Sequence, residues 1–193
     1  MYQPFLIGNR FRVVPPGTST KLERLDLIME RGAFGSGEHE TTHSCLELLE
    51  DLPEVRQADL LDLGSGTGIL AIAALKLGAA AATCVDISPE AVDNCRHNCV
   101  LNGCADQVTH VAGSLSDLGS RNFDLVLANI YGDLLLQFAS DLASRVRPGG
   151  LLLLSGILWE YNFAVRQTYA AAGCELLRNR MLEEFSTLLL QKR

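Results

Sequence analysis

A glycine-rich turn between two short apolar runs is the part of this sequence best suited to bind a small ligand. The turn holds Gly64, Gly66 and Gly68, and the second apolar run ends at Asp86. Glycines in such a turn present backbone N–H groups and let a ligand approach where a Cβ would clash. A carboxylate at the end of the next strand can accept hydrogen bonds from both hydroxyls of a ribose. The G-x-G-x-G spacing fails the dinucleotide pattern G-x-G-x-x-G at its third glycine, which disfavours a pyrophosphate ligand.

A second acidic residue, Asp62, stands in the run before the turn, 24 residues ahead of Asp86. If the two runs are neighbouring parallel strands, the two carboxylates bracket one crevice at the strand ends. The alternative is that both acids only cap loops and that the glycines only turn the chain.

A different chemistry is suggested by His39, Glu40 and His43, which match the H-E-x-x-H pattern of zinc proteases. In that pattern two histidines one helical turn apart bind the metal, and the glutamate acts on a metal-bound water. Gly35 and Gly37 place His39 in a loop or a first helical turn, and no third ligand follows at a familiar spacing. We therefore expect no metal here and keep a zinc hydrolase as a remote alternative.

The six cysteines could form three disulfides, and Cys95, Cys99 and Cys104 cluster near His97. On a helix Cys95 and Cys99 share a face from which His97 points away, and no C-x-x-C pair occurs. A chain of 193 residues can bury its own core, and we expect no secretory leader. The cysteines are therefore expected to be free thiols that act as small buried hydrophobes in a cytoplasmic protein.

The residues that must position these groups alternate short apolar runs with helical stretches, which is the pattern of βαβ units around a parallel sheet. The expected strands are Asp59–Leu63, Thr83–Asp86, Val108–Val111, Phe123–Asn129, Leu151–Ser155 and Glu184–Gln191. The expected helices are Ile69–Leu77, Pro89–Leu101, Leu134–Val146 and Glu160–Ala172, the third of them ending at Pro148 and its two glycines.

The residues before Ala58 follow a less regular pattern. We expect a turn at Val13–Gly17, an extended segment at Leu25–Met29 and a helix at Ser44–Leu52. The sequence thus predicts one compact domain, with residues 1–57 as an N-terminal extension and residues 58–193 as the core.

Composition excludes several classes of protein. Hydrophobic residues make up 48% and charged residues 20%, which is globular composition and excludes disorder for most of the chain. Sixteen basic against 23 acidic residues give a net charge of -7, so we expect no direct nucleic-acid binding and no attraction to anionic lipid. The longest apolar stretch, Gly68–Val85, contains Lys76 and Gly78, and we expect no membrane span.

Several motifs resemble those of class I S-adenosylmethionine-dependent methyltransferases. Asp62–Gly68 with Asp86 is similar to the first two motifs of that class, Phe123–Ile130 to its fourth-strand motif and Arg147–Gly150 to the turn before strand five. The resemblance implies a Rossmann-like α/β fold: a mostly parallel seven-stranded sheet with helices on both faces and a reversed strand near the C-terminus.

A narrower resemblance is to the PrmA family, which methylates the stalk-base protein of the large ribosomal subunit. It rests on Ala33–Thr42, Gly68–Ala74 and Ala128–Ile130, and extends from about Val13 to the C-terminus. It implies S-adenosyl-L-methionine as the cofactor. The residues expected to bind this cofactor are Phe34, Gly35, Thr42, Asp62, Gly64, Gly66, Asp86, Ile87, Ser114 and Asn129.

Two of these residues have more specific expected roles. Phe34 and the glycines beside it would form a loop that folds over the methionine end of the cofactor. Asn129 is the expected catalytic residue, because its carbonyl oxygen can accept a hydrogen bond from the incoming N–H and orient the acceptor.

The chain departs from the family in four respects. Ser36 stands where the family usually has threonine, the usual Pro-Gly is missing around Glu30–Gly32, and Gly113–Leu115 lacks the acid that many relatives use near the adenine amine. The family also carries an N-terminal module that docks the ribosomal substrate. We expect none here, because only about thirty residues precede Phe34.

The expected function is therefore methylation of a protein amine, either a lysine or an α-amine, on a ribosomal protein or another protein. A methyltransferase acting on a small molecule and a non-catalytic cofactor-binding domain are the alternatives.

Overall fold

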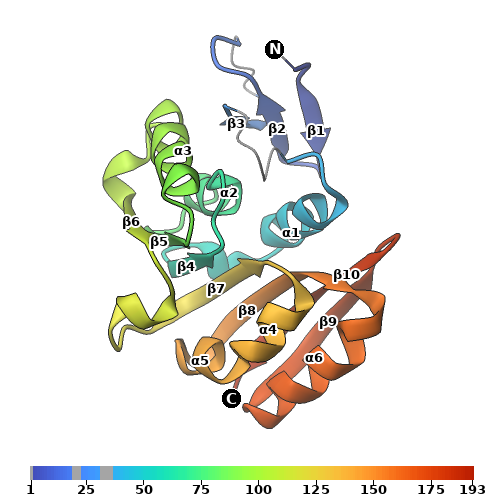
Figure 1. The fold of residues 1–193 in the computed structure, drawn as a ribbon. Coiled ribbons are helices and arrows are strands. Elements are labelled where there is room, and N and C mark those ends of the chain that lie inside the picture. Colours follow the sequence, from blue (N-terminus) through green and yellow to red (C-terminus); the bar gives the residue numbers. More distant parts are fainter. Residues whose placement is uncertain (1, 19–22, 31–36) are drawn as a thin grey trace.

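The computed structural model describes residues 2–18, 23–30 and 37–193, which form two sheets (Figure 1). The small sheet has the strand order β1-β2-β3 and the large one the order β6-β5-β4-β7-β8-β10-β9. In the small sheet β1 (Phe5–Ile7) runs antiparallel to β2 (Phe11–Val14), and β2 runs parallel to β3 (Leu25–Ile28). The small sheet packs beside the helices that cover one face of the large one (Figure 1).

The large sheet confirms the expected α/β architecture. Its strands are β4 (Asp59–Leu63), β5 (Ala81–Asp86), β6 (Val108–Ala112), β7 (Phe123–Asn129), β8 (Val146–Leu158), β9 (Cys174–Met181) and β10 (Phe185–Lys192). Strands β4 to β8 pair in parallel, and β10 runs antiparallel to both β8 and β9. The helices are α1 (Glu40–Glu50), α2 (Ile69–Lys76), α3 (Pro89–Leu101), α4 (Gly132–Gln137), α5 (Ala139–Ser144) and α6 (Trp159–Ala171).

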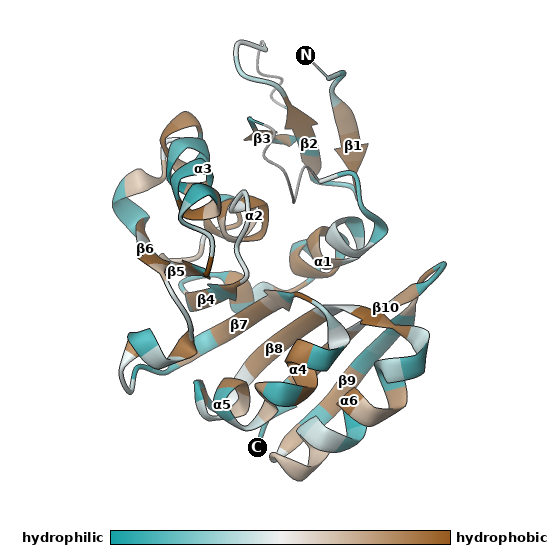
Figure 2. Cartoon of the chain, in the orientation of Figure 1, coloured by the Kyte–Doolittle hydropathy of each residue, from teal (hydrophilic) through white to brown (hydrophobic). Residues whose placement is uncertain are grey.

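Helices cover both faces of the large sheet, because successive side chains of a strand point to opposite faces. Leu60 and Leu127 pack into the core shared with α1, α2 and α3, whereas Leu61 and Val126 pack into the core shared with α4, α5 and α6. Helix α2 is apolar on every side because the sheet, α1, α3 and β3 all contact it (Figure 2). Within the described residues no helix is long and apolar enough to span a bilayer.

The helix predicted over Leu134–Val146 is wrong, because the chain breaks it at Phe138. This residue has φ -94° and ψ 6°; it ends α4 and begins α5. Val146 already pairs with Phe123, so β8 starts before the Pro-Gly-Gly sequence that was expected to be only a turn. A register irregularity before Leu151 accommodates Pro148, which has no N–H to donate.

Other differences lie at the edges of the fold. Strand β9 was not predicted, because its side chains are almost all exposed and show no alternation of polar and apolar residues. Strands β1 and β2 were also missed; Val13 and Val14 belong to β2, and the predicted turn follows them. Helix α1 begins four residues earlier than expected, at Glu40 instead of Ser44.

All six cysteines are buried, as expected for small hydrophobes, and none forms a disulfide.

Candidate cofactor and acceptor site

The glycine loop joins β4 to α2 and is fixed to the end of β5. The backbone N–H groups of Gly64 and Ser65 donate to the carbonyl of Val85 at 2.8 and 3.1 Å. Gly64 and Gly68 have φ angles of 69° and 79°, a region that favours glycine. A Cβ on Gly68 would lie 2.5 Å from the Sγ of Cys95, and a Cβ on Gly64 would collide with the side chain of Ile130. Both positions therefore require glycine.

Asp86 ends β5 facing this loop. Its Oδ2 accepts from the N–H of Gly66 at 2.9 Å, and its Oδ1 accepts from the N–H of Ser88 at 3.0 Å. Each oxygen keeps a second acceptor position, so the two amides orient the carboxylate without saturating it. The Asp86 carbonyl also accepts from the N–H of Gly113, which fixes the loop after β6 beside it.

Asp62 lies beneath the loop with only 2% of its surface exposed. Its Oδ2 accepts from the N–H of Ala71, in the first turn of α2, at 3.2 Å. Burial raises the pKa of Asp62 to about 7, and the nearby charge of Asp86 adds to this effect. The carboxylate thus faces the start of α2 instead of an open crevice.

This burial predicts a pH dependence of stability. Unfolded, Asp62 ionises near pH 3.8, and folded near pH 7. Between these values the folded chain holds a proton that the unfolded chain has lost, so the free energy of unfolding falls as the pH rises, then levels off above about pH 7. We expect Asp62→Asn to remove this decline, with a higher melting temperature than the wild type at pH 7.5 and a similar one near pH 4. Thermal melts without ligand from pH 4 to 8, with the exposed Asp106→Asn as control, test this; an unchanged profile would contradict it.

The loop after β6 supplies an acid that sequence reasoning missed. Ser114 donates to Asp117 Oδ2 from its backbone N–H at 2.8 Å and from its hydroxyl at 3.1 Å. These hydrogen bonds lower the pKa of Asp117 and place its carboxylate beside Gly113. The S-x-x-D capping-box pattern was the available signal. Asp117 thus places a carboxylate beside the Gly113–Leu115 segment, which has no acid of its own.

Asn129 ends β7 and is brought next to Thr42 of α1, a residue 87 positions away in the sequence. Its Nδ2 lies 3.4 Å from the Thr42 hydroxyl, a long hydrogen bond. The neighbouring Ile130 N–H donates to the Ser155 carbonyl on β8 at 3.2 Å, which fixes the strand end. With Nδ2 turned towards Thr42, Oδ1 is the atom of the Asn129 side chain that can accept from an incoming donor.

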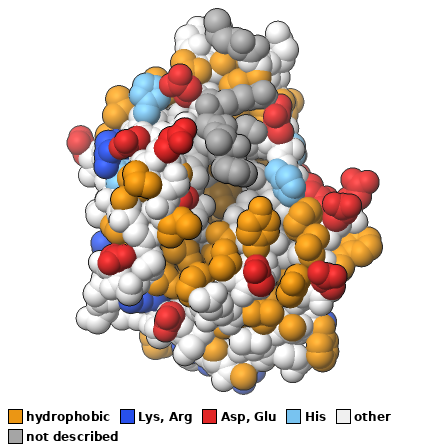
Figure 3. All heavy atoms as spheres, in the orientation of Figure 1, with side chains coloured by type: hydrophobic (Ala, Val, Ile, Leu, Met, Phe, Trp, Pro, Cys, Tyr) orange, Lys and Arg blue, Asp and Glu red, His pale blue; other side chains and the backbone are white. Residues whose placement is uncertain are grey.

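Two further observations at this end of the sheet are those expected of a ligand site. Ser65 Oγ is buried in the glycine loop and has no hydrogen-bond partner among the described residues. Ile87, directly after Asp86, exposes 83% of an apolar side chain, and Tyr131 exposes 69%. Figure 3 shows hydrophobic side chains on this face around a hollow near its centre. Phe34 and Gly35, also expected in the site, lie outside the described residues.

Comparison with known proteins identifies the family. The whole chain, residues 1–193, matches the family described as ribosomal protein L11 methyltransferase (PrmA).

The chain belongs to the PrmA family.

Similar proteins agree with this assignment. The PrmA-family chain is 40% identical to a ribosomal protein L11 methyltransferase from Geobacter metallireducens, over 98% of this chain and 63% of that protein. It thus spans less than two thirds of that relative's length. A crystal structure of ribosomal protein L11 methylase from Lactobacillus delbrueckii subsp. bulgaricus superposes with a TM-score of 0.89 at 26% identity, covering 100% of this chain and 99% of that one.

A more distant structure shares the fold alone. It is an RNA methyltransferase from Salinibacter ruber in complex with S-adenosyl-L-homocysteine, with a TM-score of 0.61 at 20% identity over 77% of this chain and 90% of that one.

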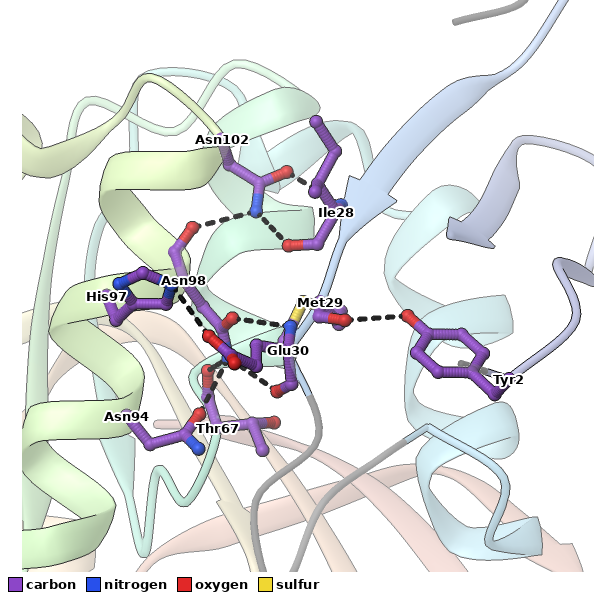
Figure 4. Close-up of polar contacts among 9 residues, drawn as sticks. All are labelled: Tyr2, Ile28, Met29, Glu30, Thr67, Asn94, His97, Asn98 and Asn102. Atoms are coloured by element: carbon purple, nitrogen blue, oxygen red, sulfur yellow. Dashed lines mark hydrogen bonds and ion pairs between the residues drawn. The ribbon is translucent and has the colours of Figure 1, made fainter. Parts of the chain in front are cut away.

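In this PrmA-family chain a buried asparagine connects the glycine loop to the small sheet (Figure 4). Asn98 of α3, fully buried, accepts from the N–H of Glu30 at 2.8 Å and donates to the carbonyls of Glu30 and Thr67 at 3.3 and 3.0 Å. One turn later, Asn102 bonds both backbone groups of Ile28. A polar residue such as asparagine is normally expected on the surface. The sequence therefore did not indicate that Asn98 would be buried between Glu30 and Thr67.

The H-E-x-x-H residues of the chain have other partners. His39 caps α1 and its Nδ1 lies 2.8 Å from the Thr41 hydroxyl, while the His43 ring stacks on Phe5. The Glu40 carboxylate accepts from two backbone N–H groups of the β9–β10 turn, at 2.9 and 3.2 Å. Among the residues that the structure describes, no group of three or more His, Cys, Asp or Glu could hold a metal.

Proposed function

We propose that this chain is an S-adenosylmethionine-dependent methyltransferase that modifies an amine of ribosomal protein L11. The observation that carries the proposal is the Asp86 carboxylate, held by two backbone amides beside the glycine loop in a chain of the PrmA family. The names of the similar proteins support L11 as the acceptor. The proposed core is residues 58–193, to which the extension 1–57 contributes α1 and Thr42, and the proposed place of action is the cytoplasm.

The residues present fit a nucleoside cofactor. Asp86 can accept from the ribose hydroxyls, and Ile87 offers an exposed apolar side chain to the adenine. Asp117, on the adjoining loop, can accept from the adenine amine. Ser65 Oγ would gain a hydrogen-bond partner that it lacks among the described residues.

The cofactor would supply a methyl group bonded to a sulfonium sulfur, and this sulfur is a good leaving group. The protein's task is then to bind, orient and desolvate the acceptor. Asn129 Oδ1 can accept from the acceptor N–H and so direct the nitrogen lone pair towards the methyl group, with Thr42 fixing the amide. A lysine acceptor, whose pKa is normally near 10.4, must first lose a proton, whereas an α-amine with a pKa near 7.7 to 8.0 needs less help.

Transfer of radioactive methyl groups from S-adenosylmethionine to recombinant L11 tests this function. We expect label on L11 and none on L11 whose amines have been acetylated beforehand. A thermal titration with S-adenosylhomocysteine runs in parallel. Stabilisation by that ligand without label on any protein would favour the non-catalytic alternative, and no stabilisation would overturn the proposal.

A further inference from the structure

Large apolar side chains are exposed close to the proposed acceptor site. Tyr131 follows Asn129 by two residues and is mostly exposed, and Trp159, the first residue of α6, exposes 53% of its surface. Leu158, which ends β8, is also exposed. We refer to Tyr131, Leu158 and Trp159 as the apolar patch. Exposed groups of this kind often mark binding surfaces, and tyrosine and tryptophan contribute most to binding at protein interfaces.

Two backbone contacts place the patch beside the acceptor site. Ile130, which follows the acceptor-orienting asparagine, lies against β8, where a Cβ on Gly156 would come within 2.4 Å of its carbonyl oxygen. Trp159 is only three residues further along the chain. On the other side, Gly132 at the start of α4 packs against Tyr161 of α6, and the two helices lie side by side (Figure 1). The patch therefore lies at the carboxyl ends of β7 and β8.

Hydrogen bonds hold Trp159 in a fixed position. Its Nε1 donates to the Phe185 carbonyl at 3.1 Å, and its backbone N–H donates to the Glu184 carbonyl at 3.2 Å. The Glu184 N–H in turn donates to the Glu40 carboxylate at the start of α1. Glu40, a residue of the H-E-x-x-H pattern, thus supports the turn on which the indole lies. A side chain that is already fixed loses little conformational entropy when a partner binds.

The border of the patch is negatively charged. Glu160 follows Trp159 directly, and Glu183 and Glu184 lie in the turn that supports it; all three are exposed. Within the described part of the chain, none of these three carboxylates bonds to another group. Arg166, the only basic residue of α6, lies two turns further along the helix. An apolar surface with an acidic border fits a polypeptide whose apolar side chains are flanked by lysine or arginine.

We propose that the apolar patch binds the acceptor polypeptide next to the amine that is methylated. The strand order β5-β4-β7-β8 places the proposed cofactor residues on one side of Asn129 and the patch on the other. A polypeptide whose amine reaches Asn129 while the cofactor is bound therefore has the patch side to lie on. An apolar side chain of the acceptor would pack on Tyr131 and Trp159, and its basic residues would face the acidic border. This inference rests on the proposed function.

Peptide binding tests the patch without turnover. The probe is a fluorescein-labelled peptide of four Leu-Lys repeats, and its fluorescence anisotropy is measured with the wild type, Tyr131→Ala and Trp159→Ala. Val100→Ala is the control, because Val100 is an exposed apolar residue of α3, which packs on β5 and β6 at the other end of the large sheet. We expect affinities about tenfold weaker for the two patch variants and an unchanged affinity for the control.

Trp159→Phe separates contact with the ring from support of the turn. It loses the same Nε1 hydrogen bond as Trp159→Ala but keeps an aromatic ring, so it should bind the peptide within about twofold of the wild type. An affinity as weak as that of Trp159→Ala would assign the loss to the turn and overturn the patch. A peptide of four Leu-Glu repeats should bind the wild type at least about tenfold more weakly than the Leu-Lys peptide, because the border is acidic.

Equal affinity for the Leu-Lys peptide in the wild type and the patch variants would also overturn the proposal. Sedimentation velocity tests a second copy of the chain as the occupant: a wild-type dimer that Trp159→Ala converts to a monomer would assign the patch to that copy instead. If L11 is the acceptor, both patch variants should raise the KM for L11 and leave the KM for S-adenosylmethionine unchanged. Weaker peptide binding by the variants without methylation of L11 by the wild type would retain the patch and reject L11.

Discussion

Asp86→Ala should abolish measurable binding of S-adenosylmethionine and S-adenosylhomocysteine. The substitution removes the proposed acceptor of two ribose hydroxyls and leaves the N–H groups of Gly66 and Ser88 without their partner. Hydrogen bonds to a charged group contribute about 1.5 to 3 kcal/mol each, so two of them correspond to a loss of affinity of more than about 100-fold. Isothermal titration with S-adenosylhomocysteine measures this directly.

Two controls separate loss of the ligand contact from loss of the fold. Asp106→Ala removes the same charge from an exposed position and should bind normally. Asp86→Asn keeps one oxygen as an acceptor and should keep the loop in place, yet still weaken binding. A folded Asp86→Ala protein with wild-type affinity would rule out this placement of the cofactor.

Asn129→Ala should lower kcat about 100-fold, the loss expected when a reacting group is misplaced by about 1 Å. The side chain is proposed to accept from the acceptor N–H through Oδ1. Without it, the nitrogen lone pair is no longer oriented towards the methyl group. The affinity for S-adenosylhomocysteine should change much less than kcat, because Asp86 and the glycine loop are untouched. Single-turnover methyl transfer to L11 separates the chemical step from binding.

Thr42→Val tests the same positioning role with a smaller change than Asn129→Ala. It removes only the hydroxyl that contacts Asn129 Nδ2, and should reduce kcat about tenfold if it positions the amide. Asn122→Ala is the matched control for Asn129→Ala, since Asn122 is an exposed asparagine whose side chain donates to the Ser144 carbonyl, away from the site. Equal kcat for Asn129→Ala and the control would remove Asn129 from the mechanism.

The elements around the glycine loop could be predicted almost to the residue. Strong local signals delimit them: Gly64 and Gly68 end β4 and begin α2, and the Ser88 hydroxyl caps α3 just where Pro89 starts it. Each signal acts within a few residues, so it can be recognised without knowledge of the fold. The seven-stranded sheet and the family followed from the same motifs.

What could not be predicted depends on contacts between distant segments. Strand β9 exists because β10 pairs with it, and its own residues show no strand pattern. The burial of Asp62 depends on how α2 packs over the end of β4. Likewise, Ser44 and Arg180 line one pocket only because the hairpin returns to α1. These features are properties of the tertiary arrangement.

Asn98 of α3 links the glycine loop to the end of β3, so the positions of these two segments depend on each other. Because Asn98 bonds both Thr67 and Glu30, a ligand that immobilises the glycine loop also favours the docked position of the end of β3. Such coupling works equally in both directions. Substitutions in the small sheet, such as at the buried Arg12–Asp26 ion pair, would therefore modulate cofactor affinity without touching the cofactor.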